Sequence, residues 1–304
     1  MIRIANAPCS WGALEFDATE QPAPALQVLD EMAAAGYAGT ELGDWGFLPT
    51  MPAALAADIG RRHLALVGAF VPIALARAEA LEEGLDRAVR TARLLADAGR
   101  VGQVGHDPLL VLSDDNASVP NRATRAGRIR AEDGLTATEW DAFAQRAERV
   151  AMDVRDATGL RTVFHHHCAG YVETPQEIDA LLSRTDPALL GLCLDTGHLM
   201  FAGGDPLATL ATYGDRIWHL HFKDCDPELA ARARAEGWNY HTSVRRGIFC
   251  ELGHGMVPFS DVLDALHARH YTGWIVVEQD VLPGLGTPAV SAARNRAFLK
   301  RFGV

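Results

Sequence analysis

The feature of this sequence that most constrains its fold is a repeated alternation of short apolar, β-branched runs with longer amphipathic stretches. Runs of the first kind predict buried strands, and the stretches between them have the period of helices that cover a sheet. The predicted strands lie at residues 2–8, 38–42, 64–71, 101–104, 161–167, 190–195, 216–222 and 274–278. The predicted helices lie at residues 24–35, 52–62, 76–98, 136–157, 175–184, 206–213, 259–269 and 288–302. Eight such units indicate a single α/β domain over residues 1–304, a (β/α)8 TIM barrel, with a doubly wound sheet as the alternative.

Two helix starts carry a specific chemical signal. Thr136 is followed by Glu139 and Thr174 by Glu177, the spacing of a capping box in which each side chain bonds the backbone amide of the other residue. Both predicted helices therefore begin shortly after a turn, as the barrel requires. Long polar segments at 105–135 and 224–258 follow predicted strands, and we expect them to shape a substrate pocket.

Composition excludes several function classes. The formal net charge of −11 disfavours nucleic acid as a partner, because its binders need a basic face. No run of about 18 apolar residues occurs, so we expect no membrane span. The N-terminal residues lack the apolar stretch of a signal peptide, which predicts a cytoplasmic enzyme with five free cysteine thiols. A homo-oligomer is compatible with such a chain.

Polar residues gather where the later predicted strands end. In a barrel these ends share one mouth, and side chains on a strand alternate between its two faces. If the faces that carry them point inward, the mouth collects one carboxylate or imidazole from each of four successive strands: a strand-five histidine, Asp195, His221 and Glu278. Two carboxylates with imidazoles suit manganese, cobalt, zinc or iron better than magnesium, which prefers oxygen ligands.

Trp11 follows the first predicted strand. It is either an aromatic wall for a sugar ring or a packed side chain at the barrel rim, and the sequence leaves both interpretations open. The sequence contains no phosphate-binding glycine loop, dinucleotide fingerprint or Gly-x-Ser-x-Gly elbow.

Taken in order, these segments resemble a known family. The chain is similar to the xylose isomerase-like TIM barrels, which include sugar isomerases, epimerases and dehydratases, and within them to the inosose dehydratase branch. The resemblance extends over nearly the whole chain and is carried by residues 36–43, 164–167, 194–198, 219–224 and 273–278.

The resemblance implies a divalent metal, most simply manganese, held by residues of strands five to eight. Three ligands correspond to Asp195, His221 and Glu278. The strand-five ligand of the family is a glutamate. Here its position holds His165, and Glu173 in the following loop is the alternative.

The resemblance further implies a lyase of carbohydrate or inositol catabolism that acts on a small keto-inositol or keto-sugar. His167 is the predicted base for the α-proton, and Lys223 or His198 the predicted acid for the β-hydroxyl. The predicted substrate contacts are Trp11, Glu41, Glu173 and Arg246. The same site would serve a sugar isomerase or epimerase, or a β-eliminase of 3-keto-glycosides, and a sugar-binding barrel without catalysis is the non-enzymatic alternative.

Overall fold

The structure is a computed structural model that describes residues 1–12, 23–102, 107–116, 119–282 and 284–304. Eight strands within these ranges close into a parallel barrel, in the order β1-β10-β7-β6-β5-β4-β3-β2. The barrel strands are β1 (Arg3–Asn6), β2 (Gly39–Glu41), β3 (Ala65–Ile73), β4 (Leu109–Asp114), β5 (Thr162–His165), β6 (Leu190–Asp195), β7 (Ile217–Phe222) and β10 (Trp274–Val277). This arrangement confirms the predicted TIM barrel.

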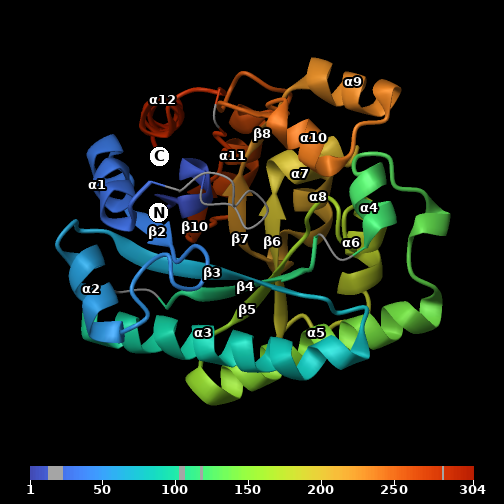
Figure 1. The fold of residues 1–304 in the computed structure, drawn as a ribbon, viewed down its shortest axis with the longest axis horizontal. Coiled ribbons are helices and arrows are strands. Elements are labelled where there is room, and N and C mark those ends of the chain that lie inside the picture. The colour runs from blue at the N-terminus through green and yellow to red at the C-terminus, as the bar shows by residue number, and fades with distance from the viewer. Residues whose placement is uncertain (13–22, 103–106, 117–118, 283) are drawn as a thin grey trace.

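Helices surround the barrel on its outer face (Figure 1). The eight predicted ones are all present, as α1 (Ala25–Ala35), α2 (Pro52–Gly60), α3 (Leu81–Gly102), α5 (Ala137–Thr158), α6 (Pro175–Leu182), α8 (Pro206–Tyr213), α11 (Phe259–Ala268) and α12 (Pro288–Lys300). The long helices α3 and α5 run along one side of the molecule in Figure 1. No helix in the described ranges is both long and apolar enough to cross a bilayer.

Short elements that the sequence did not predict are added at the carboxyl ends of several strands and between helices. They are the helices α4 (Pro120–Arg125), α7 (Thr196–Phe201), α9 (Pro227–Glu236) and α10 (Tyr240–Arg245), the strands β8 (Asp224–Cys225) and β9 (Phe249–Cys250), and the 3-10 turns η1 (Pro8–Trp11), η2 (Ala78–Ala80), η3 (Ala131–Asp133) and η4 (Gly214–Arg216).

The predicted position of the fourth strand is wrong. Residues 101 and 102 are the last turn of α3, residues 103 and 104 lie outside the described residues, and β4 begins at Leu109. β4 reads Leu-Leu-Val-Leu-Ser-Asp and is buried throughout. The segment 105–135 is therefore a strand followed by α4 and η3 rather than one long loop.

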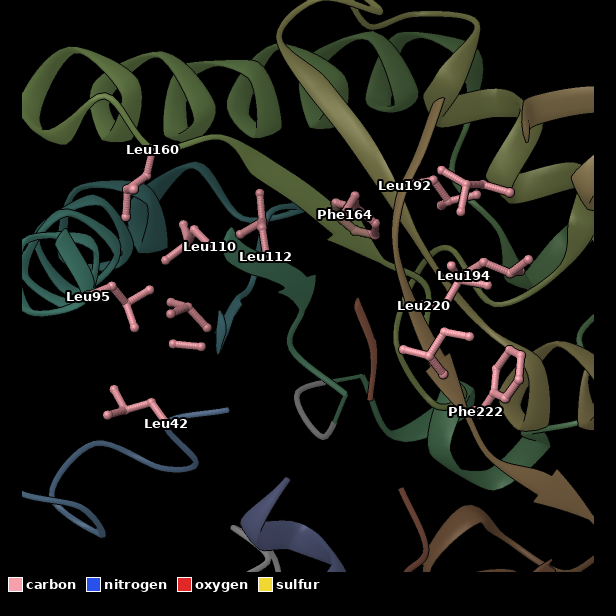
Figure 2. Close-up of a cluster of buried hydrophobic side chains, with 14 of the residues drawn as sticks. Leu42, Leu95, Leu110, Leu112, Leu160, Phe164, Leu192, Leu194, Leu220 and Phe222 are labelled. Atoms are coloured by element: carbon pink, nitrogen blue, oxygen red, sulfur yellow. The ribbon is translucent and has the colours of Figure 1, made fainter. Parts of the chain in front are cut away.

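Side chains of the strands alternate between two cores. Those pointing outward pack under the helices and form the large apolar cluster of Figure 2, which includes Leu110, Leu112, Phe164, Leu192, Leu194, Leu220 and Phe222. The intervening residues point into the barrel, where Val111, Val163 and Cys193 form a small apolar layer. Two residues further along β5 and β6, on the same inward face, lie His165 and Asp195, so the alternation places polar side chains at the mouth of the barrel.

Both predicted capping boxes are present. The Thr136 side chain accepts from the Glu139 amide at the start of α5, and Thr174 accepts from the Glu177 amide at the start of α6. Glu177 has a second role, because its carboxylate forms a doubly bonded ion pair with the buried guanidinium of Arg122, at 2.7 Å for each oxygen.

The Arg122–Glu177 pair anchors the loop that joins β5 to α6. Arg122 also donates to the carbonyl of Gly170. In the same loop Ala169 and Val172 have φ values of 75° and 67°, a left-handed conformation that costs non-glycine residues energy and persists only where neighbours enforce it. The ion pair therefore helps to fix a strained loop that begins directly after the histidines of β5.

A second anchor lies at the end of β7, where the inserted segment 224–258 leaves the barrel. The buried Asp224 carboxylate accepts hydrogen bonds from four backbone amides, those of Cys225, Gly253, Gly255 and Val257. This arrangement closes the inserted segment on itself, and within the segment α10 brings Tyr240 to His167.

Candidate metal centre

Four side chains converge inside the mouth. Asp195 Oδ2 lies 3.5 Å from His165 Nε2 and 3.9 Å from His221 Nδ1, and His221 Nδ1 lies 3.2 Å from Glu278 Oε1. The four residues are buried, and they come from β5, β6, β7 and the residue directly after β10. The structure thus brings together His165, Asp195, His221 and Glu278, as the sequence predicts.

The donor atoms of this cluster are missing partners that buried polar atoms normally have. Among the described residues, neither ring nitrogen of His165 has a hydrogen-bond partner, nor has His221 Nδ1 or Asp195 Oδ2. A buried polar atom without a partner costs about 1–3 kcal/mol, so several in one place indicate a missing ligand. Atoms bound to one ion at about 2.0–2.2 Å lie roughly 3.0–3.5 Å apart, close to the separations in this cluster. The residues therefore fit a divalent metal ion.

The remaining oxygens of the two carboxylates are held by other groups. Asp195 Oδ1 accepts from the His198 amide at 2.8 Å, which caps α7, and Lys223 Nζ lies 3.2 Å from Glu278 Oε2. Lys223 is also 3.4 Å from Asp280 Oδ2. Each carboxylate is thereby oriented with one oxygen directed at the cluster, as the outer contacts of metal ligands commonly do.

Electrostatics favours the ligand form of His165 and Glu278. Burial raises the pKa of Asp195, and the neighbouring acidic groups raise the pKa of His221 despite burial, so an ion would displace a proton from His221. Burial lowers the pKa of His165 well below its usual value and keeps the imidazole neutral. Burial alone would raise the pKa of Glu278, but the neighbouring His221 and Lys223 lower it to about 2. Neutral imidazoles and ionised carboxylates are the species that bind metals.

The contacts of Glu173 separate it from this cluster. Its two carboxylate oxygens accept from the amides of Gly127 and Ala169, at 2.7 and 2.9 Å. Of the two alternatives for the fourth ligand, the structure therefore places His165 in the cluster and uses Glu173 to hold the loop after β5.

Glu173 gives a prediction for the pH dependence of stability. Burial raises the pKa of its carboxyl from 4.5 to about 7. Because the pKa in the folded protein is the higher one, the stabilising contribution is complete below about pH 4.5 and is lost as the pH rises through about 7. The free energy of unfolding of the wild type minus that of Glu173→Gln is therefore expected to fall between about pH 4.5 and about pH 7, measured by urea unfolding. A constant difference across this window would contradict the raised pKa.

Beside the cluster, His167 has a defined tautomer. Its Nδ1 lies 2.6 Å from the carbonyl oxygen of Cys168, which can only accept, and this contact is shorter than the one of 3.3 Å to the Asn116 side-chain nitrogen, so we assign the proton to Nδ1. Nε2 then has a free lone pair, and the Tyr240 hydroxyl donates to it at 3.3 Å. Burial lowers the pKa of His167 to about 3, which keeps the ring neutral at physiological pH.

His198 has the opposite tautomer. Its ring centre lies 3.9 Å from that of His167, and its Nδ1 accepts from the Cys168 amide at 3.4 Å. The proton is therefore on Nε2, which has no hydrogen-bond partner among the described residues. The mouth thus presents a proton acceptor on one imidazole and a proton donor on the next.

Of the other predicted substrate contacts, Trp11 and Arg246 lie outside the cluster, whereas Glu41 borders it. The Trp11 ring is buried and its indole N–H donates to Glu31 at 2.6 Å, which corresponds to a packed side chain at the barrel rim. The Arg246 side chain is 48% exposed and its guanidinium lies 4.0 Å from the centre of the Trp238 ring. Glu41 contacts His219 and His221 through Oε1, at 2.9 and 3.0 Å.

Sequence reasoning missed three residues of the site. Tyr240 and Asn116, whose side-chain nitrogen is 3.3 Å from His167 Nδ1, lie in segments that were identified only as pocket-shaping insertions. Asp280 was detectable, because it stands two residues after Glu278 and contacts the same lysine.

Comparisons with known proteins agree with this architecture. A family model described as xylose isomerase-like TIM barrel matches residues 29–302. An inosose dehydratase from Geobacillus kaustophilus (strain HTA426) is 30% identical over 300 residues, which cover 99% of this chain and 94% of that protein.

Two solved structures share the fold at low sequence identity. The 3-keto-D-glucoside 4-epimerase YcjR from E. coli has a TM-score of 0.68 at 15% identity and covers 99% of this chain and all of its own. The probable 3-DHS dehydratase AsbF from Bacillus anthracis has a TM-score of 0.65 at 13% identity, with coverages of 95% and 97%.

Proposed function

The chain belongs to the xylose isomerase-like TIM barrel family, and we propose that it is a metal-dependent carbon–oxygen lyase acting on a keto-inositol or keto-sugar. The reaction removes the proton α to the ketone and eliminates the β-hydroxyl as water. The observation that carries this proposal is the pair of opposed tautomers, His167 as acceptor and His198 as donor, beside the candidate metal centre. The inosose dehydratases among the relatives support dehydration.

The metal would be held by Asp195, His221 and Glu278, whose donor atoms lie close together, with His165, 3.5 Å from Asp195, as the fourth ligand. Manganese is the first choice, and cobalt, zinc or iron are alternatives. Such an ion supplies Lewis-acid stabilisation of the negative charge that develops on the ketone oxygen.

The chain's own residues provide the proton transfers. His167 Nε2 accepts the α-proton, and the electrons of the broken C–H bond form the new double bond as the C–O bond breaks. The Nε2–H of His198 protonates the departing hydroxyl, which leaves as water. Lys223 is the alternative acid, but Glu278 and Asp280 on either side raise its pKa well above the usual value despite burial. Lys223 therefore keeps its positive charge and suits the role of holding Glu278 in position. His198 is the better proton donor to the departing hydroxyl.

Isomerisation or epimerisation is the second candidate function. The His198 proton could pass to carbon rather than to oxygen, since Nε2–H is not committed to any partner among the described residues. Elimination of a glycoside group instead of hydroxide needs the same acid and base. A sugar-binding barrel without catalysis is disfavoured by the unpartnered donor atoms of the centre, which binding of a neutral sugar alone would not require.

Proton exchange in deuterated water tests the proposal. Keto-inositols and 3-keto-sugars are incubated with the manganese-loaded protein, and loss of the α-proton signal is followed by proton NMR together with product formation. We expect exchange and water loss for at least one keto-inositol, abolition of both by a chelator, and recovery when manganese is restored.

Each alternative has its own outcome in this experiment. Exchange without water loss would reject the lyase and favour an isomerase or epimerase. The absence of exchange from every substrate, in a protein that binds manganese, would reject α-proton abstraction altogether.

A further inference from the structure

Glu41 lies on the side of the His221 ring that faces away from the metal centre. His221 Nε2 is 3.0 Å from Glu41 Oε1, whereas His221 Nδ1 is 3.2 Å from Glu278 Oε1 and 3.9 Å from Asp195 Oδ2. Glu41 is at the end of β2 and is 2% exposed, so it has no contact with bulk water that would compete for this oxygen.

An ionised carboxylate can only accept hydrogen bonds. Glu41 Oε1 lies within hydrogen-bond distance of two imidazole nitrogens, His219 Nε2 at 2.9 Å and His221 Nε2 at 3.0 Å, and both can donate to it. With Nε2–H directed at Glu41, His221 presents Nδ1 to the centre, and this nitrogen would bind an ion on losing its proton.

We infer that Glu41 is a positioning residue for the metal centre: its carboxylate fixes the tautomer and the ring orientation of His221, so that Nδ1 is presented to the ion. This role differs from the substrate contact that the sequence suggests for Glu41. It rests on the proposed metal site but concerns a residue outside the ligand set. A carboxylate behind a histidine ligand also increases the basicity of the imidazole.

The surroundings of Glu41 are built to hold the carboxylate in this position. His219, one inward position before His221 on β7, donates to the same oxygen at 2.9 Å. On the neighbouring strand, Gly68 is the register partner of Glu41, and a Cβ atom at Gly68 would lie only 3.3 Å from Glu41 Oε1. The oxygen therefore occupies space that any other residue at position 68 would crowd.

Metal affinity, measured by calorimetric titration with manganese, tests the inference without relying on turnover. Glu41→Gln keeps the size of the side chain but removes the acceptor charge, and we expect it to weaken manganese binding about 10–100-fold. Glu251→Gln is the matched control, because it makes the same change at a partly buried carboxylate whose partners, Ser291 and Arg294, lie outside the candidate ligand set. We expect less than about a threefold change in this control.

A double-mutant cycle separates positioning from a general structural effect. Glu41→Gln is also made in a His221→Ala background, where the residual affinity for manganese should not weaken further. Equal weakening in both backgrounds, or an unchanged affinity of Glu41→Gln in the wild-type background, would overturn the inference.

If Glu41→Gln fails to fold by circular dichroism, Gly68→Ala replaces it in both backgrounds, since the added Cβ would crowd the Glu41 oxygen at 3.3 Å and shift it slightly. We expect Gly68→Ala to weaken manganese binding in the wild-type background but not in the His221→Ala background. Unchanged binding in the wild-type background would overturn the inference. A wild-type protein that binds no manganese, cobalt or zinc would instead overturn the metal centre itself, so the two failures are distinguishable.

Discussion

Replacement of Asp195 by asparagine is expected to lower the rate of α-proton exchange by about a thousandfold or more. The substitution keeps Oδ1, which accepts from the His198 amide and caps α7, but it replaces the unpartnered Oδ2 that faces the centre. A bound metal supplies several kcal/mol to the transition state, and each 1.36 kcal/mol corresponds to a tenfold change in rate. The measurement is loss of the α-proton signal in deuterated water, with manganese affinity determined on the same sample.

Asp205→Asn is the matched control for Asp195→Asn. Asp205 is exposed, and it too caps a helix through Oδ1, by accepting from the amides of Leu207 and Ala208 at the start of α8. The control should retain wild-type exchange. Exchange in Asp195→Asn within about threefold of the wild type would refute the assignment of Asp195 as a ligand.

His167→Gln is expected to reduce exchange about a hundredfold to ten-thousandfold, the usual contribution of a positioned general base. The substitution removes the Nε2 lone pair, which accepts a hydrogen bond from the Tyr240 hydroxyl, but leaves the four candidate ligands unchanged. Manganese affinity should therefore stay within about threefold of the wild-type value. Activity and affinity are measured as for Asp195→Asn.

His267→Gln, at an exposed position on α11, is the control for His167→Gln and should leave both quantities unchanged. If His167→Gln lost manganese affinity in proportion to activity, His167 would be a metal ligand rather than the base.

The sequence was most informative where strand alternation decides the outcome. His165, Asp195 and His221 each lie at a carboxyl end of a strand and each point inward, as a period of two predicts. Their convergence required no knowledge of loops, because parallel strands in a barrel end at the same rim.

The fourth strand shows where the same reasoning fails. Val101 lies in the last turn of α3 with its side chain exposed, and a short segment with apolar residues at the end of a helix has no local feature that distinguishes it from a strand. The true strand, Leu109–Asp114, was hidden by the polar residues that follow it and was assigned to a loop.

The tautomers of His167 and His198 could not be predicted from the sequence either. They depend on which groups face each ring, such as the Cys168 carbonyl against His167 and the Cys168 amide against His198. Both groups belong to the loop after β5. In this loop Ala169 has a left-handed backbone conformation, which the conformational propensity of alanine does not predict. The position of Glu41 depends likewise on a register shift between β2 and β3 that side-chain patterns do not encode.

The unpartnered atoms of the centre have a consequence for folding as well as for chemistry. An ion that binds the folded chain and not the unfolded one adds RT ln(1 + [L]/Kd) to the free energy of unfolding, about 2.7 kcal/mol at a hundred times Kd. Since His165, Asp195 and His221 come from three neighbouring strands, one ion bound to them would tie β5, β6 and β7 together at the rim. The supply of metal in the cell would thereby control how long this barrel survives proteolysis, in addition to how fast it turns over its substrate.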